Sequence, residues 1–159
     1  PENFALFEAQ FANNHIPHSV STSIQKVPIG MGDAIFGAFD FWNNYENILV
    51  IWGDQVFVST KTLQETIESH LLSTGRRMTI PTSFVNKPYV QYIFNKDFSG
   101  LLNIKQAREG DICDEQGFAD VGVFCLSTSG LEDEWKEFLM NKHVGKFSKR
   151  NTLILTFNT

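Results

Sequence analysis

The residue in this sequence that is best placed to do chemistry is Asp54, which follows an apolar stretch and a glycine. Residues 47–54 read NILVIWGD. A continuous apolar run of this kind is typical of a strand covered on both faces, as in a parallel sheet. Asp54 would then lie just past the carboxyl end of the strand, where open α/β sheets bind ligands, and its carboxylate could hold a divalent cation against a phosphate. The alternative is a turn aspartate that caps the next segment.

A second candidate is the pair of glycines in Gly30-Met31-Gly32, which follows Gln25 and leads into a predicted helix. A turn that feeds a helix N-terminus offers free backbone N–H groups and the positive end of the helix dipole to an anion. Asp33 lies in the first turn, however, and would repel a phosphate placed directly there. The alternative is a purely structural turn, because glycines are common in turns of every kind.

Two further groups of polar residues point less clearly to chemistry. His70 lies on the apolar stripe of a helix predicted at residues 60–74, so we expect a packed histidine rather than a metal ligand. Asp111, Asp114 and Glu115 fall within five residues of one another. They lack EF-hand spacing, so we expect a solvated loop rather than a metal site.

The elements that must position these residues include both strands and helices. Strands are predicted at residues 18–25, 48–51, 78–85, 89–94, 101–104, 121–126 and 153–157, and helices at residues 1–13, 34–42, 60–74 and from 131 to about 142. The pair at residues 89–94 and 101–104 predicts a hairpin, because asparagine, aspartate, serine and glycine fill the turn between them. The sequence therefore predicts an α/β fold in one domain.

Composition and charge exclude several classes of protein. The 159 residues are 42% hydrophobic and 19% charged, which is ordinary for a globular domain. The net charge of -5 argues against nucleic-acid binding, and no apolar run approaches the roughly 20 residues that cross a membrane. No signal or transit peptide is recognisable. Cys113 and Cys125 are too few for a disulfide framework, so we expect a cytoplasmic location.

In their order and spacing these pieces resemble the sugar-phosphate nucleotidyltransferase family, most closely the uridyltransferase domain of N-acetylglucosamine-1-phosphate uridyltransferase. Gln25 followed by PIGMGDA at residues 28–34 is similar to the family's Gln and Leu-Gly-Thr-Gly-His-Ala. ILVIWGD at residues 48–54 is similar to its apolar strand ending in Tyr-Gly-Asp. The hairpin followed by DVG at residues 120–122 resembles the acceptor-sugar region, where the family has Asn-Thr-Gly. The resemblance covers about residues 15–127.

The resemblance implies a Rossmann-like, mainly parallel sheet with flanking helices and a β-hairpin insertion. It also implies a role for each matched position. The nucleotide would be bound by Gln25, Gly30, Met31, Gly32, Trp52 and Gly53. The sugar-phosphate side would be lined by Tyr89, Gln91, Tyr92, Gln106 and Asp120. Asp54 would be the catalytic residue, as the ligand of a Mg²⁺ ion.

The implied reaction joins a nucleoside triphosphate to a sugar 1-phosphate. The sugar phosphate attacks the α-phosphorus in line and pyrophosphate is released, giving a nucleotide sugar. This chemistry needs positioning and charge neutralisation more than a covalent nucleophile, which agrees with a sequence that shows no catalytic triad. The resemblance is also compatible with a homo-oligomer.

Departures from the family pattern support a second hypothesis. The family begins with a strand and a glycine-rich loop, followed by a lysine, that cradle the triphosphate; neither is recognisable in residues 1–159, so the resemblance implies a single domain lacking them. A later strand with a metal-binding asparagine or aspartate is also unrecognised, with Asn151 and Asn158 as nominal candidates. Gln106 and Asp120 replace a glutamate and an asparagine. We therefore expect little turnover from this chain alone, and the alternative is a non-catalytic nucleotide- or sugar-binding regulatory module.

Overall fold

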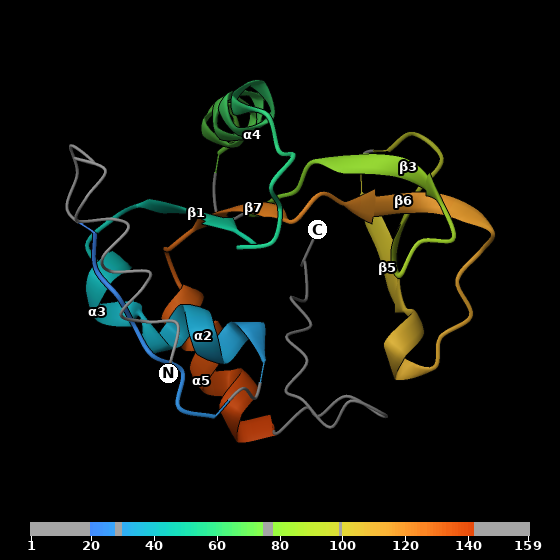
Figure 1. Ribbon diagram of the computed structural model, residues 1–159. Coiled ribbons are helices and arrows are strands. Elements are labelled where there is room, and N and C mark those ends of the chain that lie inside the picture. Colours follow the sequence, from blue (N-terminus) through green and yellow to red (C-terminus); the bar gives the residue numbers. More distant parts are fainter. Residues whose placement is uncertain (1–19, 28–29, 75–77, 99, 142–159) are drawn as a thin grey trace.

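A computed structural model of the chain describes residues 20–27, 30–74, 78–98 and 100–141. Two antiparallel sheets and a set of helices make up this part of the chain (Figure 1). The helices are α2 (Met31–Gly37), α3 (Phe39–Trp42), α4 (Thr60–Leu72), the 3-10 helix η1 (Ala107–Glu109) and α5 (Leu131–Asn141). The strands are β1 (Asn47–Ile51), β2 (Met78–Thr79), β3 (Thr82–Asn86), β4 (Val90–Phe94), β5 (Leu101–Gln106), β6 (Gln116–Asp120) and β7 (Val123–Ser127). No described helix has the length and apolar character needed to cross a membrane.

The first sheet has three strands in the order β1-β7-β2 and is covered on both faces. Figure 1 shows α4 on one side of β1 and β7, and α2, α3 and α5 on the other. Trp42, Leu126 and Leu131 form the centre of the core between the sheet and the second group of helices. Because every residue of β7 is buried, β7 is the central element of this half of the molecule.

Helix α4 is attached to the sheet through a buried histidine. The His70 side chain is fully buried, its Nδ1 lies 2.9 Å from the Thr79 hydroxyl, and its Nε2 lies 3.0 Å from Asn47 Oδ1 and 3.2 Å from the Ser127 hydroxyl. These contacts join α4 to β2, β1 and β7 respectively. The prediction of a packed histidine is confirmed.

The second sheet has four strands in the order β3-β6-β4-β5, and β4 with β5 forms the predicted hairpin. A register shift between Ile93 and Phe94 bends its end. The chain passes between the two sheets twice, from β2 to β3 and from β6 to β7. At this crossing the Val121 N–H donates to the Pro81 carbonyl at 3.3 Å. The junction between the sheets is therefore built around residues 80–81 and 121–122.

The mainly parallel sheet is not found, because every described strand pair is antiparallel. The apolar run at residues 48–51 does form a strand, but β1 pairs with β7 and is half-buried, with Ile51 43% exposed. The strand that is covered on both faces is β7. Apolar content alone could not separate these two cases, because residues 48–51 and 123–126 are equally apolar.

The structure also differs from the prediction elsewhere, and the helix predicted at residues 34–42 is found as two helices, α2 and α3. Residues 20–25 are irregular rather than a strand. This segment runs beside α2, and the Ser23 hydroxyl donates a hydrogen bond to the Gly37 carbonyl at 2.9 Å. The strand predicted at residues 78–85 is split into β2 and β3 at Pro81, which has no N–H for the ladder. Strand β6 was not predicted, because its sequence, QGFAD, lacks a regular apolar alternation. The elements predicted at residues 1–13 and 153–157 lie outside the described residues.

Candidate functional site

Two strand ends meet at the junction between the sheets and bring two groups of predicted site residues together. The register of β1 with β7 places Ile51 opposite Val123. The next residue, Trp52, donates its backbone N–H to the Gly122 carbonyl at 2.9 Å. Asp54, two residues after Trp52, therefore lies close to the turn at residues 120–122 that joins β6 to β7.

The turn that carries Asp54 is held by its backbone. The Gln55 N–H donates to the Trp52 carbonyl and the Val56 N–H to the Asp54 carbonyl, both at 3.0 Å. The Asp54 carboxylate is exposed, and the Gln55 side-chain amide donates to its Oδ1 at 3.5 Å. The cap of α4 is Ser59, whose hydroxyl accepts from the Thr62 N–H. Asp54 is therefore a turn residue, as the alternative expects, but the helix that follows is capped by Ser59.

On the other side of the junction Asp120 and Tyr92 form a hydrogen-bonded pair. The Tyr92 hydroxyl donates to Asp120 Oδ2 at 3.2 Å, and the Gly122 N–H donates to Asp120 Oδ1 at 2.9 Å. Burial, followed by the charge and the hydrogen bond of Asp120, raises the pKa of Tyr92 far above its ordinary value of 10.0. The tyrosine therefore stays protonated and fixes the orientation of Asp120.

The predicted nucleotide residues at the start of α2 form a second group. The Gln25 Nε2 donates to the Gly30 carbonyl at 3.0 Å and to Asp33 Oδ2 at 2.8 Å. Both hydrogens of this amide are thus used inside the turn, and Oε1 is the atom left to contact a ligand. Gly30 adopts φ 143°, a conformation that few side chains tolerate.

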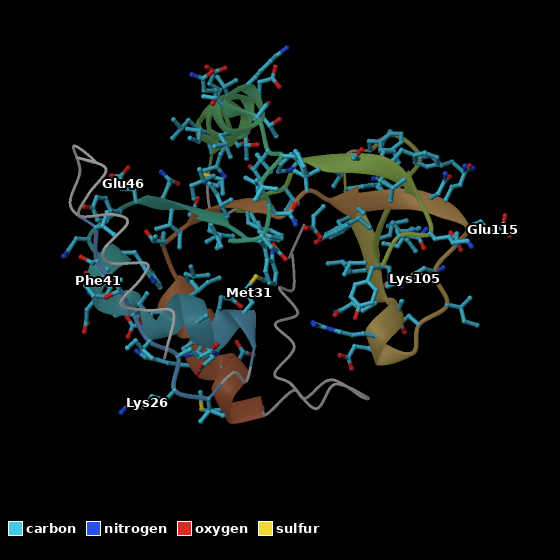
Figure 2. The ribbon with its side chains drawn as sticks, in the orientation of Figure 1. Lys26, Met31, Phe41, Glu46, Lys105 and Glu115 are labelled. Carbon is cyan, nitrogen blue, oxygen red and sulfur yellow. The ribbon has the colours of Figure 1, made fainter. Side chains whose placement is uncertain are left out.

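The second glycine of this turn has a packing role. A Cβ atom on Gly32 would lie 2.7 Å from Cζ3 of Trp135 in α5, whose ring stacks on Phe36 at 4.5 Å. The absence of a side chain at Gly32 therefore lets α2 and α5 approach each other. The neighbouring Met31 is half-buried and points from α2 toward the three-stranded sheet (Figure 2).

The predicted sugar-side residues do not all lie on one face. Gln91 and Tyr92 are adjacent in β4, so their side chains leave opposite faces of the sheet. The Gln91 amide donates to Asp114 Oδ2 at 2.8 Å and accepts from the Asp114 N–H at 2.9 Å. Lys105, labelled in Figure 2, also contacts Asp114 at 3.1 Å. The hydrogen bond from Gln91, and then the hydrogen bond and charge of Lys105, lower the pKa of Asp114. Gln91 therefore holds the acidic loop, whereas Tyr92 reaches Asp120.

Tyr89 and Gln106 lie at the base of the hairpin. The Tyr89 carbonyl accepts from the Ala107 N–H at 3.0 Å, and its side chain is 60% exposed. The Gln106 N–H donates to Asp111 Oδ2 at 2.8 Å. The Tyr89 side chain is therefore exposed, whereas Gln106 is half-buried.

The described residues offer one exposed carboxylate, that of Asp54, to the predicted cation. In the described ranges no cluster of three or more histidine, cysteine, aspartate or glutamate residues could hold a metal ion, and this includes the acidic loop at residues 111–115. Mg²⁺ is commonly held by one or two carboxylates together with substrate phosphates and water. The exposed carboxylate of Asp54 meets this requirement once a phosphate is supplied.

The structure also adds Gln55 to the candidate residues and gives a defined contact to Gly122, which the sequence named only as part of the DVG motif. Gln55 contacts both Asp54 and the turn at Gly122, and Gly122 adopts φ 73°. The glycine in the DVG motif could have indicated a positive φ, but a glutamine after an aspartate carries no comparable signal.

The chain has measurable similarity to curated proteins, although no family model matches it. It is 27% identical over 114 residues to the bifunctional protein GlmU of Carboxydothermus hydrogenoformans, which covers 70% of this chain and 25% of that protein. It is 22% identical over 156 residues to GlmU of Acetivibrio thermocellus, covering 95% of this chain and 33% of that one. A shorter match of 73 residues to GlmU of Thermosipho melanesiensis is 32% identical.

A solved structure shares the fold. HddC from Yersinia pseudotuberculosis superposes with a TM-score of 0.59 at 21% identity, over 82% of this chain and 54% of HddC. The same protein complexed with GMP-PN superposes with a TM-score of 0.58. The predicted resemblance is confirmed. The chain spans a third or less of these GlmU proteins and about half of HddC, so the similarity concerns part of each relative.

Proposed function

We propose that this chain forms part of a nucleotidyltransferase site that transfers a nucleoside monophosphate from a nucleoside triphosphate to a sugar 1-phosphate. The observation that carries the proposal is the contact between the two strand ends, the hydrogen bond from Trp52 to Gly122. This bond links the turn that carries the exposed Asp54 to the turn that contains Asp120, whose carboxylate is paired with Tyr92. The similarity to GlmU and the fold of HddC, which has been crystallised with GMP-PN, support it.

In the proposed reaction an oxygen of the sugar phosphate forms a bond to the α-phosphorus as the bond from that phosphorus to the β-phosphate oxygen breaks. Pyrophosphate is the leaving group. Asp54 would hold a Mg²⁺ ion, which supplies charge neutralisation at the phosphates. The chain's own task is to orient the two substrates at the junction between the sheets, because holding reactants in line supplies much of such a rate enhancement.

The two substrates would lie on opposite sides of Asp54. The backbone around Gly30 and Met31, the Oε1 atom of Gln25, and Trp52 with Gly53 would contact the nucleotide. On the sugar side, Asp120 keeps lone pairs beyond its two internal hydrogen bonds and can accept from a sugar hydroxyl. Tyr92 positions Asp120. The partners are thus a nucleoside triphosphate and a sugar phosphate in the cytoplasm.

A specific observation favours the second candidate, a non-catalytic binding or regulatory module. Two of the predicted ligand-binding amides are engaged within the protein, Gln91 with Asp114 and the Gln25 Nε2 with Gly30 and Asp33. Such a module would bind a nucleotide at the junction without releasing pyrophosphate.

Binding and turnover measured on the same protein separate these candidates. We expect Mg²⁺-dependent nucleotide binding, measured by calorimetry with each nucleoside triphosphate, to weaken about tenfold or more in Asp54→Ala. The matched control is Asp40→Ala, which removes another exposed aspartate, in α3. Unchanged binding in Asp54→Ala would refute the metal role. Pyrophosphate release with a panel of sugar 1-phosphates then distinguishes an enzyme from a binding module.

A further inference from the structure

Gln55 is placed between the two halves of the proposed site. Its backbone belongs to the turn that carries Asp54, and its side chain lies over Gly122. A Cβ atom on Gly122 would lie 2.4 Å from Cγ and 2.9 Å from Cδ of Gln55, and 3.0 Å from Cδ1 of Trp52. The glutamine therefore occupies the space that a side chain at position 122 would fill.

The position of Gly122 is itself fixed from both sides. Its N–H donates to Asp120 Oδ1 at 2.9 Å, and its carbonyl accepts from the Trp52 N–H at 2.9 Å. Asp120 is in turn oriented by the Tyr92 hydroxyl at 3.2 Å. The Gln55 side chain thus packs against the Cα of Gly122, whose backbone is held by these two hydrogen bonds.

In this position the side-chain amide of Gln55 contacts the carboxylate of Asp54. The distance from its Nε2 to Asp54 Oδ1 is 3.5 Å, which is a long hydrogen bond. Gln55 is exposed and polar, so burial in a core does not explain its placement. What its side chain does in the fold is to connect Gly122 with Asp54.

We propose that Gln55 and Gly122 are positioning residues that set the orientation of the Asp54 carboxylate. This inference rests on the proposed function, in which Asp54 holds a cation against the substrate phosphates. It adds that the residues on the sugar side influence the orientation of the metal ligand. Tyr92 and Asp120 hold the Gly122 backbone, and the Gln55 side chain packs on Gly122. The same side chain then donates a hydrogen bond to Asp54 and orients its carboxylate.

The geometry is tested first without any ligand. In the NMR spectrum, Asp54→Ala is expected to move the side-chain amide signals of Gln55, and Gly122→Ala is expected to move them as well. Gly130→Ala is the matched control, because Gly130 has φ 72° against 73° for Gly122 but precedes α5. If the chemical shifts of the Gln55 side-chain amide change in neither Asp54→Ala nor Gly122→Ala, the proposal is overturned.

The functional part is tested with Mn²⁺, a paramagnetic ion that carboxylates bind as they bind Mg²⁺. The Cα atoms of Trp52 and Asp54 are at most about 7.6 Å apart, because each residue spans about 3.8 Å. Mn²⁺ added with UTP, and separately with GTP, should therefore broaden the Trp52 indole N–H signal. Trp42, whose indole donates to the Ile35 carbonyl inside the core, is the internal reference.

The variants then separate the possible results. Gln55→Ala should weaken Mn²⁺ binding in the presence of nucleotide about fivefold without lowering the unfolding temperature, since one hydrogen bond to an exposed group is lost. Gly122→Ala should weaken it similarly, and in the Gln55→Ala background it should have less effect, because the obstructing Cγ is gone. Equal Mn²⁺ affinities in the unmodified chain and Gln55→Ala overturn this inference alone. Absence of Trp52 broadening in the unmodified chain with both nucleotides overturns the proposed function as well.

Discussion

At the scale of single residues, two glycines near the proposed site allow a neighbouring side chain to pack where their own side chain would lie. Gly32 leaves room for the Trp135 ring, and Gly122 leaves room for the Gln55 side chain. The first glycine brings two helices together, whereas the second joins the turn at β7 to the turn that carries Asp54. Gly32, which the sequence assigned to a nucleotide turn, therefore has a packing role in the fold.

We predict that Gly32→Ala destabilises the protein by about 1–3 kcal/mol, because its Cβ would lie 2.7 Å from a Trp135 ring atom and that ring is also held by stacking on Phe36. The control is Gly37→Ala in the same helix, whose Cβ would meet no atom closer than 3.9 Å. Urea denaturation measures both variants. If the two alanine variants are equally stable, the packing role of Gly32 is wrong.

The raised pKa of Tyr92 predicts a loss of stability at alkaline pH. Burial and Asp120 favour the protonated form in the folded state, while an unfolded tyrosine titrates near pH 10. The contribution is therefore complete below about pH 10 and is lost as the pH rises toward the folded-state pKa, because the unfolded chain then releases a proton that the folded chain keeps. Unfolding free energies measured between about pH 9 and about pH 11 should fall more steeply for the unmodified protein than for Tyr92→Phe. Parallel profiles would contradict this account.

At the scale of elements, the three-stranded sheet is held to α4 by polar contacts and to α2, α3 and α5 by apolar ones. His70 contacts Asn47, Thr79 and Ser127 on the α4 face. Trp42, Leu126 and Leu131 pack together on the opposite face. The strand ends at the site are thus supported from both sides of the sheet.

We predict that His70→Ala costs about 2–4 kcal/mol of unfolding free energy, because it leaves a cavity and removes a hydrogen-bond partner from the buried Ser127 and from the half-buried Asn47 and Thr79. Gln64→Ala is the control, since Gln64 is exposed on the same helix. Guanidinium denaturation provides the measurement. A loss no larger than that of Gln64→Ala would show that α4 is held mainly by other contacts.

Most of the described helices and strands could be predicted from the sequence, but the pairing of the strands could not. The helix at residues 60–74, the hairpin and the buried strand near residue 124 are found, because amphipathic spacing and turn residues are local signals. The antiparallel pairing of β1 with β7 joins residues about 76 positions apart, from Asn47↔Ser127 to Ile51↔Val123, and no local pattern encodes it. Within the proposed site, Asp54 is a prediction from its place after an apolar run, whereas no sequence pattern indicates Gln55, because its contact is with a glycine that is distant in sequence.

At the scale of the whole molecule, the two sheets meet near Asp54 of the predicted metal site and near Tyr92 and Asp120 of the predicted sugar side. The chain crosses between the sheets at residues 80–81 and 121–122, and Trp52 is hydrogen-bonded to this crossing.

The most direct test of the central claim is the position of a bound ion. A crystal of this protein grown with Mn²⁺ and a nucleoside triphosphate would locate the ion by its anomalous scattering. We expect the ion within about 2.5 Å of an Asp54 carboxylate oxygen and in contact with the nucleotide phosphates. A nucleotide and ion bound elsewhere, with Asp54 facing solvent, would contradict the account.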